Sequence, residues 1–139
     1  MIRPIMTNRM FLSLPSSAAT AADAQTAQDL LDTLASLDEA ACLAANQIGV
    51  AKAVVVYHDE DEQPHVMYNP VLKQALGAYK TVEGCLTLEA ESKVTRYERV
   101  KVVYDELVDG ALVSRKRDFT GWTAELIQHM IDHCKGKLV

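Results

Sequence analysis

The stretch Ile127-Gln128-His129-Met130-Ile131-Asp132-His133-Cys134, near the C-terminal end of the chain, places two histidines four residues apart. Residues separated by four positions lie on the same face of an α-helix, one turn apart. Two imidazoles spaced in this way are a common pair of ligands for a metal ion. The stretch therefore predicts a C-terminal helix that offers His129 and His133 to one metal ion.

The residue after the first histidine is unusual for such a site. The zinc-hydrolase pattern His-Glu-x-x-His has the same spacing, and its glutamate serves as general base. Here Met130 occupies that position, and a thioether has no acidic proton and is at best a weak acceptor. The sequence thus predicts a metal site that lacks the usual proton carrier.

A catalytic metal usually has three protein ligands and one open position, and the chain has three cysteines that could supply the third, Cys42, Cys85 and Cys134. Cys134 follows His133 directly, so its side chain points about 100° away around the helix. Spacing alone leaves Cys42 and Cys85 open. Asp132 lies on the opposite flank of the helix from Met130, and we interpret it as a support for the ligands or an ion-pair partner, with Arg96 as a candidate partner.

Composition predicts one ordinary soluble domain over residues 1–139. The chain is 49% apolar and 24% charged, which is typical of globular proteins. A net charge of −5 and the lack of a clustered basic face argue against a nucleic-acid or anionic-membrane partner. Three cysteines are too few for a disulfide framework, and no signal peptide or membrane span is visible. We expect a cytoplasmic protein.

The order of the remaining segments predicts an α+β fold. Residues 1–19 are interpreted as an extended arm with little structure, and Thr20 with Asp23 predicts a capped helix at about 21–37. Strands are expected over 53–57, 65–68, 71–79, 93–98, 99–106 and 112–119. Asp109-Gly110 indicates a tight hairpin between the last two. We expect mixed or antiparallel sheets packed around the C-terminal helix, with one N-terminal helix, and Trp122 and Tyr97 in the core.

Three ordered motifs resemble those of the peptide deformylases. That family carries Gly-x-Gly-x-Ala-Ala-x-Gln, then Glu-Gly-Cys-Leu-Ser/Thr, then Gln-His-Glu-x-Asp-His. The chain has Ala-Ala-Cys-Leu-Ala-Ala-Asn-Gln over 40–47, Glu-Gly-Cys-Leu-Thr over 83–87 and Gln-His-Met-Ile-Asp-His over 128–133. The second motif matches in full, the third lacks the glutamate, and the first has lost both glycines, to Ala40 and Cys42. The short length of the chain and its Asp-His-Cys-x-Gly ending resemble those of a compact Gram-positive-type branch of this family.

The resemblance implies a role for each matching residue. Cys85, His129 and His133 would hold one divalent ion, Fe²⁺ natively with Zn²⁺ or Ni²⁺ as substitutes, which suits two nitrogens and a thiolate. The Gln47 amide and the Leu86 backbone N–H would stabilise the oxyanion that forms during attack on a formyl carbon. Cys42 and Leu43 would contact the substrate peptide. Glu83, Arg96 and Asp132 would support the ligands.

The family reaction is hydrolysis of the formyl group from N-formylmethionyl nascent peptides, a step of protein maturation after translation. Because Met130 replaces the general acid/base, we expect this activity to be weak or lost. The alternative is a non-catalytic metal- or peptide-binding module on the same fold. The expected partners are formylated nascent peptides or similar peptide N-termini.

Overall fold

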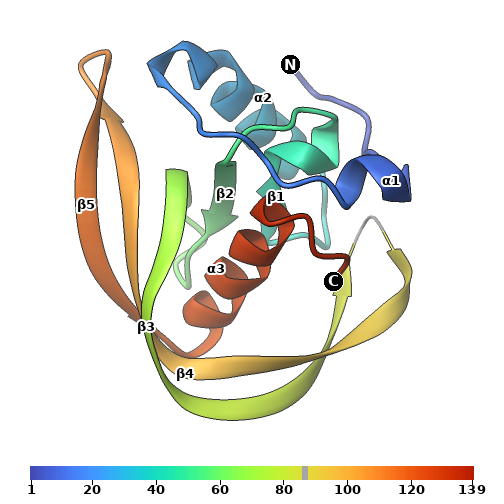
Figure 1. Cartoon of the computed structure of the whole chain (residues 1–139). Helices are drawn as coiled ribbons and strands as arrows, with labels where there is room; N and C mark the ends of the chain where they lie inside the picture. Colours follow the sequence, from blue (N-terminus) through green and yellow to red (C-terminus); the bar gives the residue numbers. More distant parts are fainter. Residues whose placement is uncertain (86–87) are drawn as a thin grey trace.

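A computed structural model describes residues 1–85 and 88–139 and confirms the α+β class (Figure 1). In chain order the elements are α1 (Arg9–Leu12), the 3-10 turn η1 (Ala21–Asp23), α2 (Ala24–Ala35), β1 (Cys42–Ala44), the 3-10 turn η2 (Ala45–Ile48), β2 (Val54–His58), β3 (Pro64–Cys85), β4 (Leu88–Val108), β5 (Ala111–Thr120) and α3 (Gly121–Cys134). The strands form one sheet in the order β1-β2-β3-β4-β5, and each neighbouring pair is antiparallel.

Strand β2 is buried on both faces and divides the core in two. Val54 and Val56 belong to a cluster beneath α2, whereas Val55 and Tyr57 belong to a cluster beneath α3. Successive side chains of a strand point to opposite faces, so a continuous β-branched run suits a strand covered on both sides. Strand β1 pairs with β2 and contacts both α2 and α3, so the first motif lies between these two helices.

The long hairpin of β3 and β4 replaces four shorter strands that we expected from the sequence, 65–68, 71–79, 93–98 and 99–106. Asn69-Pro70 does not end the strand, because Asn69 adopts φ +53° and pairing with β4 shifts register between Tyr68 and Val71. A second shift follows between Leu72 and Gln74, and the ribbon curves strongly beneath α3 (Figure 1). Such irregularities increase local bending and twist, and here they bring Cys85 back beside α3.

Local signals at element ends are found as expected. Thr20 and Asp23 form a capping box, and Asp109 and Gly110, both with positive φ, make the two-residue turn between β4 and β5. Gly136, at φ +79°, follows the end of α3.

The N-terminal arm is more structured than we expected. It contains the short helix α1, and the Ser16 N–H donates to the carbonyl of Cys134, 2.8 Å away. The arm therefore helps hold the C-terminal end of α3. Within the described residues, no helix is long and apolar enough to cross a membrane.

Candidate metal centre

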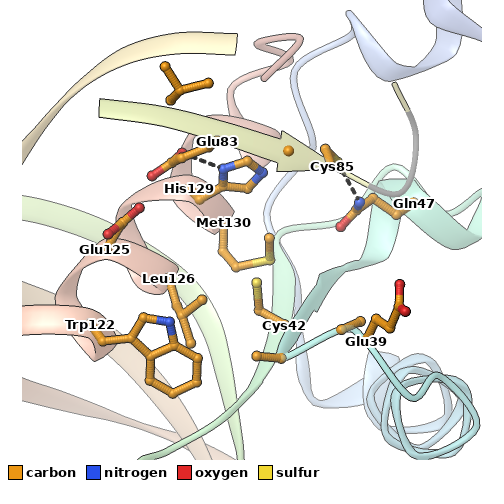
Figure 2. A pocket seen from close by; sticks show the side chains of 14 residues that line it. Glu39, Cys42, Gln47, Glu83, Cys85, Trp122, Glu125, Leu126, His129 and Met130 are labelled. Carbon is orange, nitrogen blue, oxygen red and sulfur yellow. Dashed lines mark hydrogen bonds and ion pairs between the residues drawn. The ribbon is translucent and has the colours of Figure 1, made fainter. Parts of the chain in front are cut away.

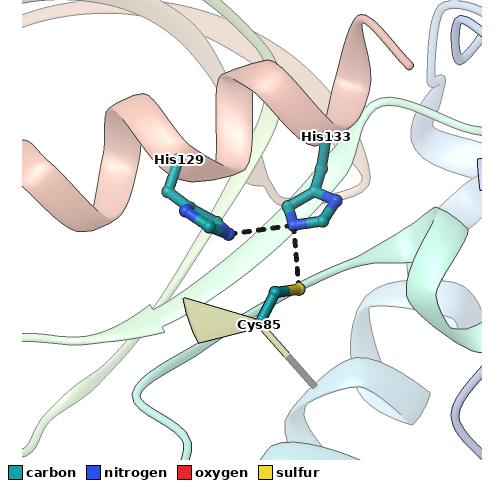
Figure 3. A group of neighbouring side chains, drawn as sticks. All are labelled: Cys85, His129 and His133. Carbon is teal, nitrogen blue, oxygen red and sulfur yellow. Dashed lines mark hydrogen bonds between the residues drawn. The ribbon is translucent and has the colours of Figure 1, made fainter. Parts of the chain in front are cut away.

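Helix α3 and the end of β3 bring three potential metal-ligating atoms together (Figure 3). The ligand atoms of Cys85, His129 and His133 all lie within 4.8 Å of one another. His133 Nε2 is 3.0 Å from His129 Nε2 and 3.4 Å from Cys85 Sγ. Both histidines are buried, and Cys85 and His129 line a cavity.

The donor chemistry of this cluster fits a divalent transition metal. With bonds of about 2.0 Å to nitrogen and about 2.3 Å to sulfur, ligands around one tetrahedral ion lie roughly 3.3–3.6 Å apart, close to the two spacings above. A thiolate with two imidazoles suits Fe²⁺, Zn²⁺ or Ni²⁺. Metal-ligating histidines usually donate their other ring N–H to a carboxylate. His129 Nδ1 lies 2.7 Å from Glu83 Oε1, which directs the Nε2 lone pair of His129 toward the cluster.

A buried ion-pair network supports the cluster from behind. The Arg96 guanidinium donates through Nε and Nη2 to Glu83, with distances of 2.6–3.1 Å, and through Nη1 to Asp132 at 2.7 Å. Arg96 is 4% exposed, and a buried charge needs such partners because it has lost its hydration. The network links β3, β4 and α3 at the position of His129.

These contacts shift the protonation of the groups involved. Burial opposes ionisation of Glu83, but hydrogen bonds with His129 and Arg96 outweigh it and lower the pKa of this carboxyl to about 2. Burial also disfavours the charged form of His129, yet hydrogen bonds with Cys85 and Glu83 raise its pKa to about 9. The negative charge that holds a proton here equally favours a metal cation.

The other two cysteines are in apolar surroundings. Burial, with a smaller contribution from Cys85 and Glu83, raises the pKa of the Cys42 thiol to about 12. Burial alone raises the pKa of Cys134 to about 12, and both residues pack against the core cluster beneath α3. Cys85 is instead the cysteine whose sulfur lies within 4.8 Å of the ligand atoms of both histidines, and this geometry favours it over the other two.

Gln47 presents its side-chain amide to the cluster. Its Oε1 accepts from the Ala44 N–H at 2.9 Å, which fixes the orientation of the amide. Its Nε2 donates to Cys85 Sγ at 3.3 Å (Figure 2). The first-motif glutamine is therefore held with N–H groups at the metal cluster. Leu86, whose backbone N–H was expected to act with Gln47, lies outside the described residues.

Met130 occupies an apolar position beside the metal cluster. It is 1% exposed and belongs to the core cluster beneath α3, and Figure 2 shows its thioether directed toward Cys42. Met130, from α3, and Cys42, from β1, both line the cavity that Cys85 and His129 also line. Leu43 is fully buried beneath α2, so its main chain is the part of that residue left for a ligand.

The candidate ligands Cys85 and His129 line a cavity of about 500 Å³ between α3, β1 and the end of β3 (Figure 2). Trp122, expected in the core, is 47% exposed and lines this cavity. Glycine at 121 adopts φ +62°, and the helix begins there. Ala124, in the same first turn, is fully buried in the core cluster beneath α3, so Trp122 lies on the side of this turn that faces the cavity, and its apolar character alone misplaced it. Tyr97 is partly buried against the core.

The sequence analysis did not identify two residues of this region. Glu125 lies one turn before His129 on α3 and lines the cavity. The Asn46 amide donates to the carbonyl of His133 at 2.9 Å and ties η2 to the end of the helix. Helical spacing from His129 could have placed Glu125 on the ligand face, whereas the Asn46 contact joins residues 87 positions apart.

Comparisons with known proteins agree with the motifs. The family model described as polypeptide deformylase matches residues 10–139. The chain belongs to the peptide deformylase family. It is 39% identical to the peptide deformylase of Clostridium beijerinckii over the full length of both chains, and 36% identical to peptide deformylase 3 of Shewanella oneidensis over 79% of this chain and 68% of that one.

Solved structures of the peptide deformylase family have the same fold. A crystal structure from Legionella pneumophila is 29% identical, with a TM-score of 0.85, and covers 99% of this chain and 83% of that chain. The enzyme from Thermus thermophilus gives the same score and coverage at 27% identity. The family consists of metal-dependent hydrolases that remove formyl groups from nascent peptides, and this member has a Cys/His/His cluster that could hold the metal.

Proposed function

We propose that Cys85, His129 and His133 hold one divalent ion, Fe²⁺ natively and Zn²⁺ or Ni²⁺ as substitutes, and that the site binds formylated peptide N-termini. The observation that carries this proposal is the convergence of three donor atoms within 4.8 Å at the base of an open cavity. The ion, when bound, supplies Lewis-acid activation of water and of the formyl carbonyl.

Gln47 is the residue of the described chain best placed to bind the formyl oxygen. Its amide is oriented by Ala44 and lies beside Cys85. One amide N–H reaches the thiolate, and the second is free to donate to an oxyanion, which is typically worth about 10²- to 10³-fold in rate. The Leu86 N–H is proposed as the second donor.

Met130 limits the hydrolytic step. Cleavage of the formyl amide requires a proton on the departing amine, and a buried thioether cannot deliver one. Loss of such a group typically lowers the rate about 10²- to 10⁴-fold. We therefore propose weak or absent deformylase activity.

A second function is favoured by the apolar surroundings of Met130. The thioether packs into the core beside Cys42, so this position is filled rather than left for water. A binding module that captures formylated N-termini without cleaving them fits this packing.

One pair of measurements tests both functions. Protein loaded with Ni²⁺ or Fe²⁺ is assayed for formate release from formyl-Met-Ala-Ser, with chelator-treated protein as control, and the same peptide is titrated calorimetrically. Slow release above the control supports a weak hydrolase, and heat without release supports the binding module. Absence of metal uptake together with absence of heat would overturn the whole proposal.

A further inference from the structure

The cavity beside the metal cluster has a strongly one-sided charge. Among its described lining residues, three are glutamates, Glu39, Glu83 and Glu125, and none is a lysine or arginine. Glu83 is already neutralised by Arg96 and His129. Glu39 is exposed on the segment before β1, and Glu125 projects from α3 (Figure 2). The charge that an occupant would meet is therefore that of Glu125 and Glu39.

Glu125 has little compensation from the rest of the chain. The Tyr79 hydroxyl donates to its Oε1 at a long 3.4 Å, and no lysine or arginine forms an ion pair with it among the described residues. A hydrogen bond with Glu83, followed by burial and the charge of Glu83, raises the pKa of Glu125. A cation placed beside Glu125 would favour the ionised form of this carboxyl group.

Trp122 adds an aromatic surface next to Glu125. It lies three residues before Glu125 on α3 and lines the same cavity with 47% of its surface exposed. Side chains three apart on a helix are neighbours. An indole face with an adjacent carboxylate is a favourable environment for an ammonium or guanidinium group, through cation–π attraction and a charge-assisted hydrogen bond.

The dimensions match a basic side chain near a formylated terminus. Glu125 and Trp122 precede His129 by four and seven residues, which corresponds to roughly 6 and 10 Å along the helix axis. A lysine extends roughly 7 Å from its α-nitrogen to Nζ, given bond lengths near 1.5 Å. A peptide whose formyl group lies at the metal cluster can therefore place a lysine of its first or second residue between Glu125 and Trp122.

We propose that Glu125, with Trp122, makes this cavity selective for formylated peptides that carry a lysine or arginine side chain at the first or second residue. The selectivity rests on the formyl-peptide binding proposed above. Glu125 acts here as a specificity-determining residue, since its carboxylate contacts the peptide side chain and takes no part in the bond that breaks.

The test compares peptides that differ in one charge. Ni²⁺-loaded protein is titrated calorimetrically with formyl-Lys-Ala-Ser and formyl-norleucyl-Ala-Ser, and with formyl-Met-Lys-Ser and formyl-Met-norleucyl-Ser. Norleucine keeps the aliphatic chain of lysine and lacks its ammonium group. We expect the lysine peptide of at least one pair to bind about 10-fold more tightly in low salt, and the preference to shrink at high salt.

Variants assign the preference to the cavity. Glu125→Gln keeps the shape of the side chain and should reduce the preference to less than about threefold. Glu60→Gln makes the same change in net charge at the exposed β2–β3 turn and should leave the preference intact. Loss of the preference in both variants would assign it to net charge and overturn the role of Glu125.

The two proposals fail in different ways. Equal or tighter binding of both norleucine peptides by the wild-type protein overturns the selectivity and leaves formyl-peptide binding standing. Failure of all four peptides and of formyl-Met-Ala-Ser to bind overturns formyl-peptide binding, and the selectivity with it.

Discussion

His129 and Met130 are adjacent on α3, yet their environments are opposite. His129 has a carboxylate behind it, a thiol and an imidazole in front of it, and a buried arginine one contact away. Met130 packs in the core cluster and, at the wall of the cavity, is directed toward Cys42. The candidate metal ligand His129 is thus supported by polar partners, while the adjacent position, where the family motif has a glutamate, is part of the core. The metal binding proposed for His129 and the proton transfer expected of the family glutamate would depend on separate sets of contacts, so one could change without the other.

The largest effect should come from removing a ligand on the polar side. We expect Cys85→Ala to reduce bound metal from about one ion per chain to nearly none, because two imidazoles alone hold a divalent ion weakly. Metal content after dialysis, measured by atomic emission, gives the answer. Cys42→Ala is the matched control and should keep its metal; equal metal in Cys85→Ala would remove Cys85 as a ligand.

Restoring a proton carrier at the apolar position should give the next largest effect. Met130→Glu is expected to raise formate release from formyl-Met-Ala-Ser by at least ~10²-fold. Met130→Gln has nearly the same shape and cannot carry the proton, so it should stay at the wild-type rate. If the two variants release formate equally slowly, the block lies in the altered first motif at Ala40 and Cys42.

Weakening the support behind His129 should have a smaller effect on metal binding. Glu83→Gln is expected to lower metal affinity about 10- to 100-fold and to reduce stability, because Arg96 keeps only Asp132 as a carboxylate partner. Urea unfolding and competition with a chromogenic chelator measure the two effects. Asp132→Asn, which leaves the Glu83 contacts in place, should cost less on both scales.

The difference in stability between the wild type and Glu83→Gln should depend on pH in a definite direction. The native pKa of Glu83 is lowered to about 2 from an ordinary value of 4.5. Its contribution to stability is therefore complete above pH 4.5 and is lost as the pH falls toward 2. The stability difference between wild type and Glu83→Gln should shrink over that interval; a difference that stays constant down to pH 2.5 would contradict the assignment.

The smallest effect is expected at Cys42. Cys42→Gly restores the small residue of the family motif and enlarges the cavity next to Met130, so formyl-peptide affinity should change by only a few-fold. The same substitution in Met130→Glu should raise activity further, since the new carboxylate would have more room. Activity unchanged in that double variant would show that Cys42 does not restrict the site.

Much of the fold was accessible from sequence because its signals are local. Thr20 with Asp23, Asp109 with Gly110, and the four-residue spacing of the histidines each act through contacts within one turn. The course of β3 was not accessible. Asn69-Pro70, taken alone, predicts the end of a strand. Pairing with β4 and the register shifts beside this dipeptide keep the strand continuous.

Around the site, too, some features follow from residue type and others depend on tertiary contacts. Arg96 could be suggested as a partner of Asp132 from charge alone, but its simultaneous contact with Glu83 depends on how β3, β4 and α3 meet. Glu125 and Trp122 were overlooked or misplaced because helical periodicity predicts which residues share a face and says little about where that face leaves the core. Asn46 reaches the end of α3 across the fold.

The sequence by itself determined the family, the α+β class, the identity of the candidate ligands and the loss of the glutamate. Each of these depends on residue types and on spacings of a few residues. The tertiary structure alone decided that Cys85 meets the two histidines while Cys42 and Cys134 lie in apolar surroundings, and that Glu125 faces a cavity without a cationic partner in the described chain. Those features depend on the bend of β3 and β4, which brings residues 38 to 48 positions apart in sequence into contact and sets their burial and charge.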